Sequence, residues 1–166
     1  MVMDRDAWNE RYRGAELVWG SDANCFVEQV LGAREAGGRA LDLACGEGRN
    51  AIWLAPRGWS VTAVDYSDVA IERAQKLAAA AGVEVEWVRE DVTSYAPEAQ
   101  AFALALVSYL PVGRGARRLA LAHAAKALAP GGELFMIGHA ARNLAEGVGG
   151  PRDPSVLWDP DEIAED

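Results

Sequence analysis

Residues 41–51 read Leu41-Asp42-Leu43-Ala44-Cys45-Gly46-Glu47-Gly48-Arg49-Asn50-Ala51, an apolar run joined by a Gly-x-Gly turn to an amphipathic segment. The apolar run predicts a strand over 39–44, and the segment after the turn predicts a helix over 50–57. Glycine lets such a turn take positive φ and approach a ligand closely, and the free N–H groups of a helix start attract a carboxylate or phosphate. The turn is therefore a candidate ligand site, although a strand-to-helix turn with glycines can also be merely tight.

Further strands and helices alternate along the rest of the chain. Apolar runs of strand length predict strands at 59–64, 83–88, 102–107 and 133–137. Ser67 is the expected cap of a helix that runs to Gly82, and an Ala- and Leu-rich stretch predicts a crossover helix over 116–128, ended by Pro130-Gly131-Gly132. This alternation indicates an α/β, Rossmann-like doubly wound fold with a mostly parallel sheet in the strand order 3-2-1-4-5. The long loop 140–158 is more typical of a functional segment than of an idle one.

The segment before residue 38 is predicted to form a helical flap. Trp8 and Tyr12 lie four residues apart, on one face of a short helix. Asn24 is the expected cap of a second helix, which Gly37 and Gly38 are expected to stop. The chain thus divides into an N-terminal flap over 1–37 and a ligand-binding Rossmann-like domain over 38–166, within one compact domain overall.

The composition favours a cytoplasmic protein that acts on small molecules. A formal net charge of −9 works against binding to nucleic-acid phosphates. The sequence has no apolar run of membrane-spanning length and no basic, apolar leader at its start, so no membrane association is expected. Cys25 and Cys45 are too few for a disulfide framework and lack zinc-ligand spacing, which predicts reduced thiols and no metal site.

Two carboxylates narrow the kind of ligand. Asp65 ends the second predicted strand 17 residues after Gly48, close to the spacing at which an acid accepts hydrogen bonds from a ribose. Asp42 lies beside the turn, where a carboxylate would repel a pyrophosphate but favour an ammonium or sulfonium cation. Asp42 could equally hold the loop through local hydrogen bonds, and the two roles can coexist.

The 41–51 stretch, with Val64-Asp65-Tyr66-Ser67 and Arg89-Glu90-Asp91-Val92, resembles the class I S-adenosylmethionine-dependent methyltransferases. Together with the turn, the N-terminal Trp8-Asn9-Glu10-Arg11-Tyr12 is similar to small bacterial enzymes of the tellurite-resistance and thiopurine methyltransferase type. The resemblance implies in-line transfer of a methyl group from S-adenosylmethionine to a small-molecule acceptor, with S-adenosylhomocysteine as product. The acceptor atom, whether oxygen, nitrogen, sulfur or a metalloid, stays open.

The resemblance also implies a set of cofactor-binding residues. Asp42 and the turn would hold the methionine moiety, Asp65 the ribose hydroxyls, and Asp91 with the Val92 N–H the adenine. For Asp91 a plain turn-capping role, and for Tyr66 plain packing, are the alternatives. Trp19 is a candidate lid residue, although aromatic residues at helical spacing are more often core. The full set is Trp19, Asp42, Ala44, Gly46, Gly48, Asn50, Asp65, Tyr66, Asp91, Val92 and Ser108.

The acceptor end is predicted at the carboxyl edge of the sheet. Ser108 and Tyr109 follow the fourth strand, and His139 follows the fifth, where it could act as a base or orient an acceptor. Tyr109 and His139 are the candidate catalytic residues, with a structural histidine as the alternative for His139. His123 lies within the crossover helix and is assigned no role. The Asn/Asp-Pro-Pro-Tyr and Pro-Cys motifs of nucleobase methyltransferases are absent.

The end of the sequence departs from the family. Relatives continue past the helix expected at Asp161 into two more strands, which this sequence lacks. An uncovered sheet edge predicts either a truncated chain or a homodimer that covers the edge. The same departure keeps open a non-catalytic pseudo-enzyme that only binds S-adenosylmethionine. An NAD(P)-binding oxidoreductase is the other alternative, which Asp42 disfavours.

Overall fold

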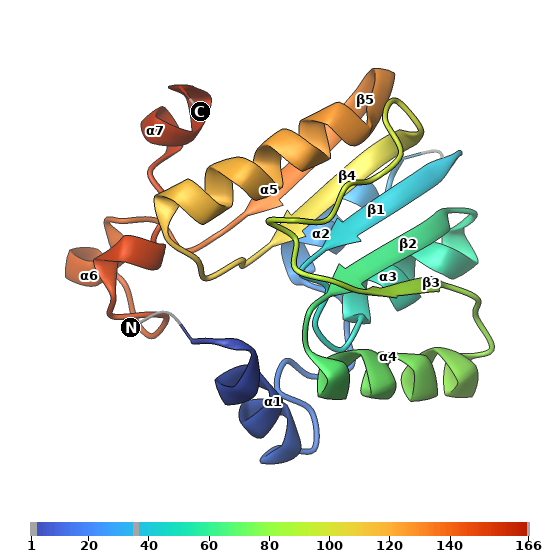
Figure 1. Ribbon diagram of the computed structural model, residues 1–166, viewed down its shortest axis with the longest axis horizontal. Coiled ribbons are helices and arrows are strands. Elements are labelled where there is room, and N and C mark those ends of the chain that lie inside the picture. Colours follow the sequence, from blue (N-terminus) through green and yellow to red (C-terminus); the bar gives the residue numbers. More distant parts are fainter. Residues whose placement is uncertain (1–2, 35–36, 166) are drawn as a thin grey trace.

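A computed structural model describes residues 3–34 and 37–165 and contains a single five-stranded parallel sheet in the order β3-β2-β1-β4-β5 (Figure 1). Strand β1 sits at the centre and pairs with β2 on one side and β4 on the other. This order confirms the prediction of a Rossmann-like doubly wound sheet. The strands are β1 (Arg39–Leu43), β2 (Ser60–Asp65), β3 (Glu86–Arg89), β4 (Phe102–Ser108) and β5 (Leu128–Ile137).

Side chains cap the first N–H groups of helices α1, α2 and α4. Asp4, Asn24 and Ser67 each accept a hydrogen bond from the first turn that follows, as expected of capping residues. The α-helices are α1 (Arg5–Arg13), α2 (Cys25–Leu31), α3 (Arg49–Leu54), α4 (Asp68–Ala81), α5 (Arg114–Ala127), α6 (Asn143–Glu146) and α7 (Pro160–Glu165). Two short 3-10 helices are η1 (Ala55–Arg57) and η2 (Pro154–Val156).

The sheet is buried between two helical layers. On one face, Leu41, Leu43 and Val107 form a core with Ala120 and Leu121 of α5. On the other face, side chains of the same strands pack against α2 and α3. Successive side chains of a strand point to opposite faces, so continuously apolar strands serve both layers.

Several boundaries differ from the sequence prediction. Helix α2 ends at Gly32, before the predicted stop at Gly37 and Gly38, and the helix after the glycine turn covers only Arg49–Leu54 before it tightens into η1. Strand β5 begins at Leu128, so Pro130-Gly131-Gly132 lie inside it rather than before it. The strand accommodates them through a shift in its register with β4, with Gly131 at φ +81°. The predicted segments 1–37 and 38–166 include residues 1, 2, 35, 36 and 166, which lie outside the described residues.

The segment 140–158 is a closed loop with structure of its own, not a featureless one. It contains α6 and η2, and a bridge between Ala140 and Trp158 joins its two ends.

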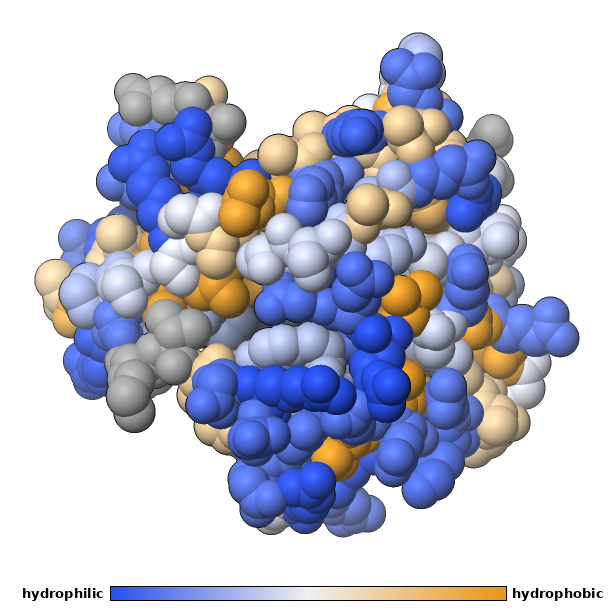
Figure 2. All heavy atoms as spheres, viewed as in Figure 1, coloured by the Kyte–Doolittle hydropathy of each residue, from blue (hydrophilic) through white to orange (hydrophobic). Residues whose placement is uncertain are grey.

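Strand β5 forms an outer edge of the sheet with no further strand partner among the described residues, and a homodimer at this edge stays a prediction. Hydrophilic residues cover most of the face shown in Figure 2, with hydrophobic residues in small separate groups. In the described part of the chain, no helix is both long and apolar enough to span a membrane.

Candidate functional site

The most unusual group in the structure is the carboxylate of Asp42. Its side chain is 1% exposed, and neither carboxylate oxygen has a hydrogen-bond partner among the described residues. Burial, together with the nearby Asp65 carboxylate, raises the pKa of Asp42 to about 7. Arg49 and the Ala51 N–H, which is close but lacks hydrogen-bond geometry, oppose this shift only in part. An unsatisfied buried carboxylate is costly, and a cation bound nearby would relieve that cost.

Asp65 holds the glycine turn. One oxygen accepts the Gly46 N–H at 2.8 Å and the other accepts the Ser67 N–H at 2.9 Å. Burial raises the pKa of Asp65, although these hydrogen bonds oppose the change. The loop-holding role that the sequence left open for Asp42 therefore falls to Asp65. Both carboxylates lie on the same face of the sheet as Ser108, because Asp42 is in register with Ala63 and Leu106.

The flap covers the turn with aromatic side chains. A Cβ atom on Gly46 would lie 2.8 Å from the hydroxyl oxygen of Tyr12 and 3.6 Å from Nε1 of Trp19. The Trp19 Nε1–H donates to the Tyr12 hydroxyl at 3.3 Å, and Arg49 donates to the Trp19 carbonyl at 2.8 Å. Tyr12 is buried whereas Trp19 is 40% exposed, so Tyr12 belongs to the core and Trp19 lies at the rim of the site.

Two buried polar residues that the sequence did not single out tie the flap to the sheet. Glu47 accepts the Val18 N–H at 2.9 Å and forms an ion pair with Arg73, also at 2.9 Å. Asn9 accepts a hydrogen bond from the Ser67 hydroxyl at 2.6 Å. For Glu47, the only sequence feature that could have indicated this structural role is its position between the two turn glycines. Asn50, a predicted cofactor residue, also holds the flap in place, because its amide oxygen accepts the Asn24 N–H.

The predicted adenine end lies just past β3. Asp91 is exposed, and its Oδ1 accepts the N–H and the hydroxyl of Thr93, which is the turn-capping geometry named as its alternative. Val92 is buried, and its carbonyl lies 3.2 Å from Nδ1 of His123. His123, assigned no role from sequence, therefore supports this turn. Tyr66 donates its hydroxyl to the Met3 carbonyl at 3.3 Å, and burial raises its pKa to about 12.

Ser108, Tyr109 and His139 meet at the carboxyl ends of β4 and β5. The Ser108 hydroxyl is buried without a partner among the described residues. Tyr109 has φ +54°, a left-handed conformation that is uncommon outside glycine, and its N–H donates to the Ile137 carbonyl at 2.7 Å. The Tyr109 and His139 rings lie 4.8 Å apart, tilted by 52°. The structure thus brings together the two residues that the sequence proposed for the acceptor end.

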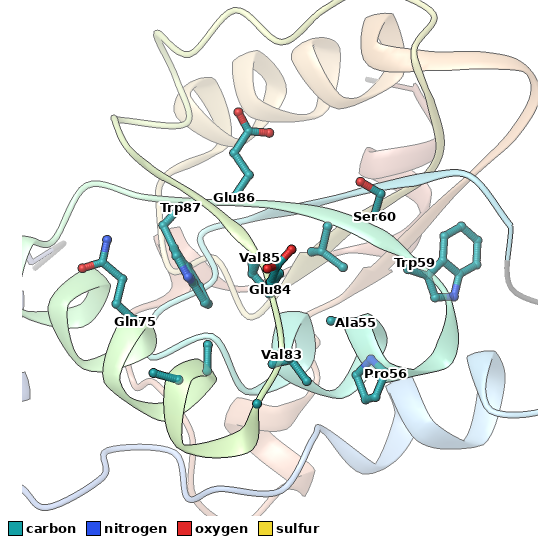
Figure 3. Close-up of a pocket in the computed structure, with 14 residues that line it drawn as sticks. Ala55, Pro56, Trp59, Ser60, Gln75, Val83, Glu84, Val85, Glu86 and Trp87 are labelled. Carbon is teal, nitrogen blue, oxygen red and sulfur yellow. The ribbon is translucent and has the colours of Figure 1, made fainter.

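A large open groove lies at the opposite edge of the sheet. It has a volume of about 940 Å³ and runs between η1, α4 and the amino ends of β2 and β3 (Figure 3). Trp59 and Trp87 lie on opposite sides of it in Figure 3. Ligands of open α/β sheets bind at the carboxyl ends of the strands, so this groove is not the candidate site. The Trp87 ring of this groove also packs against Gly48 and so supports the glycine turn of the candidate site.

Comparison with known proteins identifies the family. Residues 40–132, more than half of the chain, match the family described as Methyltransferase domain. A protein of Geobacillus sp. (strain WCH70), described as "Putative methyltransferase", is 38% identical over 70 residues, which cover 41% of this chain. The matched part spans 28% of the length of that relative.

Solved structures share the fold. The TehB-like SAM-dependent methyltransferase from Corynebacterium glutamicum aligns with 97% of this chain and 79% of its own, at 21% identity and a TM-score of 0.69. A SAM-dependent methyltransferase from Thiobacillus denitrificans, in complex with S-adenosyl-L-homocysteine, aligns with 82% of this chain and 56% of its own, at 26% identity and a TM-score of 0.60. By family match, sheet order and glycine turn, the chain belongs to the methyltransferase-domain family, within the class I S-adenosylmethionine-dependent methyltransferases.

Proposed function

We propose that this protein transfers the methyl group of S-adenosylmethionine to a small-molecule acceptor. The observation that carries the proposal is the unpartnered, buried carboxylate of Asp42 beneath the Gly46–Gly48 turn. S-adenosylmethionine carries an ammonium and a sulfonium cation and no phosphate, which suits a site that presents the buried carboxylates of Asp42 and Asp65. A pyrophosphate-containing dinucleotide would meet repulsion from the Asp42 carboxylate.

The remaining cofactor contacts are assigned by position along the same edge of the sheet. The backbone at Ala44, Gly46 and Gly48 would hold the methionine moiety. Asp65 would receive the ribose hydroxyls on the lone pairs that Gly46 and Ser67 leave free, since each carboxylate oxygen accepts more than one hydrogen bond. Asp91 would accept from the adenine amino group through Oδ2, because Thr93 occupies Oδ1. Trp19 at the rim and the half-buried Tyr66 would flank the bound molecule.

The acceptor would bind beside Tyr109 and His139, whose rings contact each other. Bound S-adenosylmethionine supplies an activated methyl group, and the protein's task is to align a nucleophile behind it and exclude water. Tyr109 and His139 present a phenol and an imidazole at the carboxyl ends of neighbouring strands, where either can hydrogen-bond an acceptor and the imidazole can take its proton. Ser108, on the same sheet face as Asp42, would complete the boundary between cofactor and acceptor.

Titration calorimetry with S-adenosylmethionine, S-adenosylhomocysteine and NADH tests the cofactor assignment. Binding of the first two and not NADH is expected, and binding of NADH alone would overturn the proposal. Methyl transfer is then followed by mass spectrometry with a panel of phenol, amine, thiol and metalloid-oxyanion acceptors. Tight binding without transfer to any acceptor class would instead favour the non-catalytic S-adenosylmethionine-binding pseudo-enzyme.

Replacement of Asp65 by alanine is expected to weaken S-adenosylhomocysteine binding at least tenfold, or about 1.4 kcal/mol. The change removes the proposed ribose acceptor and the hydrogen bond that holds the Gly46 N–H. Asp68→Ala is the matched control, because Asp68 lies three residues further on and, among the described residues, forms ion pairs only with Arg5 and Arg89. An affinity of Asp65→Ala within about threefold of the original protein would remove Asp65 from the site.

A further inference from the structure

The guanidinium of Arg117 is buried, yet it touches neither the proposed cofactor residues nor the acceptor pair. Arg117 lies on α5 and is 1% exposed. One of its nitrogens donates to the Leu157 carbonyl at 3.1 Å, and another lies 3.7 Å from the Glu162 carboxylate. Its Nε atom has no hydrogen-bond partner among the described residues. A buried cation with partial pairing costs free energy, so its place on α5 calls for a function other than stability.

The partners of Arg117 belong to the segment that returns to the sheet after the 140–158 loop. Its guanidinium carbon lies 5.7 Å from the centre of the Trp158 ring, and Arg114 adds a second ion pair to Glu162 at 3.4 Å. Helix α7 and the residues before it are thereby fastened to the start of α5 (Figure 1). Arg117 is the only one of these cations that reaches both the Leu157 carbonyl and the Trp158 ring among the described contacts.

Trp158 connects this fastening to the end of β5. The backbone N–H of Trp158 donates to the His139 carbonyl at 2.8 Å, and the backbone carbonyl of Trp158 accepts the Ala141 N–H at 2.9 Å. Its indole lies flat against Gly138, where an added Cβ would come within 2.4 Å of the ring. The backbone on both sides of His139 is therefore held by Trp158, and only glycine at position 138 leaves room for that contact.

His139 in turn faces Tyr109, whose strained backbone has to be held by its surroundings. The Tyr109 backbone is in the left-handed region, and its N–H donates to Ile137, two residues before His139. A residue in a sparsely populated conformation persists only when surrounding contacts determine it. The contacts run without a break from Arg117 through Leu157 and Trp158 to His139 and Tyr109.

We propose that Arg117 is a positioning residue that holds the His139 imidazole against Tyr109 at the acceptor end. The inference rests on the proposed function in placing the acceptor beside these two rings. Arg117 acts through Trp158 and does not touch the reacting atoms. Its loss would leave the cofactor residues, which precede β4 apart from Ser108, in place and would disturb acceptor alignment.

Nuclear magnetic resonance of the two histidines tests the proposal in the variant Arg117→Met. Methionine fills similar volume without a charge, and such replacements of buried ions are often tolerated. The chain has only His123 and His139, so their imidazole signals can be told apart. We expect the His139 signal to lose the ring-current shift from Tyr109, whereas His123, on the same helix as Arg117 and bonded to Val92, keeps its position.

The control variant is Lys126→Met, which removes an exposed cation from the same helix and should shift neither histidine. In Arg117→Met, affinity for S-adenosylhomocysteine should stay within about twofold, while kcat/KM for the best acceptor of the panel falls on the order of 10- to 100-fold. An unchanged His139 signal, or equal shifts of both histidines, overturns the positioning role. Failure of the unmodified protein to bind S-adenosylhomocysteine would instead refute the proposed function, and the histidine spectra would still test the contact chain.

A second variant applies if Arg117→Met does not fold. Trp158→Phe keeps the backbone hydrogen bonds to His139 and Ala141 but withdraws the indole from Arg117 and Gly138. The same selective movement of the His139 signal is expected, and its absence in a folded Trp158→Phe protein contradicts the proposal.

Discussion

Replacement of Asp42 by asparagine is expected to stabilise the protein at neutral pH while it weakens cofactor binding. The asparagine side chain has nearly the same shape but no charge, so it removes the need to bury an ion that lacks hydrogen bonds. The two effects have opposite signs because the unpaired charge destabilises the folded protein without cofactor and attracts a bound cation. Strained or unsatisfied groups of this kind commonly mark sites where stability is exchanged for function.

The sign of the pH dependence follows from the raised pKa of Asp42. In the unfolded chain the group ionises near its ordinary value of 3.8, whereas in the folded protein it keeps its proton until about pH 7. Folding thus binds a proton between these values, and its contribution to stability, complete below pH 3.8, is lost as the pH rises to about 7. At about 1.4 kcal/mol for each pH unit, the loss is on the order of 4 kcal/mol. The Asp42→Asn protein should not show it.

Urea denaturation at several pH values between 4.5 and 8 measures this effect. The difference in unfolding free energy between Asp42→Asn and the original protein should grow in favour of the variant up to about pH 7 and then level off. Asp68→Asn is the matched control, and its effect on the unfolding free energy should have the opposite sign. Hydrogen bonds from Arg5 lower the pKa of Asp68, so its loss should destabilise at neutral pH and matter less in acid. A difference for Asp42→Asn that does not change with pH would contradict the assignment.

Cofactor affinity should depend on the same group. Binding of a cation near Asp42 favours the ionised carboxylate, so S-adenosylmethionine should bind with release of a proton below pH 7 and more tightly as the pH approaches 7. Calorimetry in two buffers of different ionisation enthalpy counts that proton. In Asp42→Asn the affinity should fall at least about tenfold and the proton release should disappear.

The succession of strands and helices and the position of the site could be predicted from sequence because they depend on local patterns. The strand order followed from the Rossmann-like fold class that this succession indicates. The continuously apolar 102–107 segment is a central strand, and Asn24 and Ser67 are the helix caps that their side chains predicted. The start of β5 could not be predicted, because the Pro130-Gly131-Gly132 stretch normally interrupts structure. The shifted pairing with Phe102 and Leu104 that accommodates it is a tertiary effect.

That Asp65 and not Asp42 holds the turn could not be predicted from the sequence for a similar reason. Both acids end neighbouring strands, and only the three-dimensional path of the turn directs the Gly46 N–H toward Asp65 and leaves Asp42 without a partner. The burial of Arg117 could not be predicted from the sequence either. In sequence it belongs to a charged stretch of an amphipathic helix, which usually faces water, and its burial depends on residues 40 positions later in the chain.

Substitution of Gly48 by alanine is expected to lower the unfolding free energy by about 3 kcal/mol and to abolish measurable cofactor binding. Gly48 has φ +77°, and an added Cβ would lie 2.4 Å from Cη2 of Trp87 and 3.1 Å from Cβ of Ala74. The left-handed backbone alone costs about 1 to 2 kcal/mol for a residue with a Cβ, and overpacking against the half-buried Trp87 ring adds about 1 to 3 kcal/mol. If the turn moves to relieve the clash, the backbone that is proposed to hold the methionine moiety is displaced.

Gly82→Ala separates the two contributions. Gly82 also has a left-handed backbone, at φ +67°, but nothing lies within 4 Å of an added Cβ, so this variant reports backbone strain alone. Urea denaturation should therefore show a larger loss for Gly48→Ala than for Gly82→Ala, and titration with S-adenosylhomocysteine should show lost affinity only for Gly48→Ala. Combining Gly48→Ala with Trp87→Leu should recover the part of the stability that the clash removes. Equal losses in the two single variants would mean that Trp87 yields to the new methyl group, and that the turn does not depend on the ring beneath it.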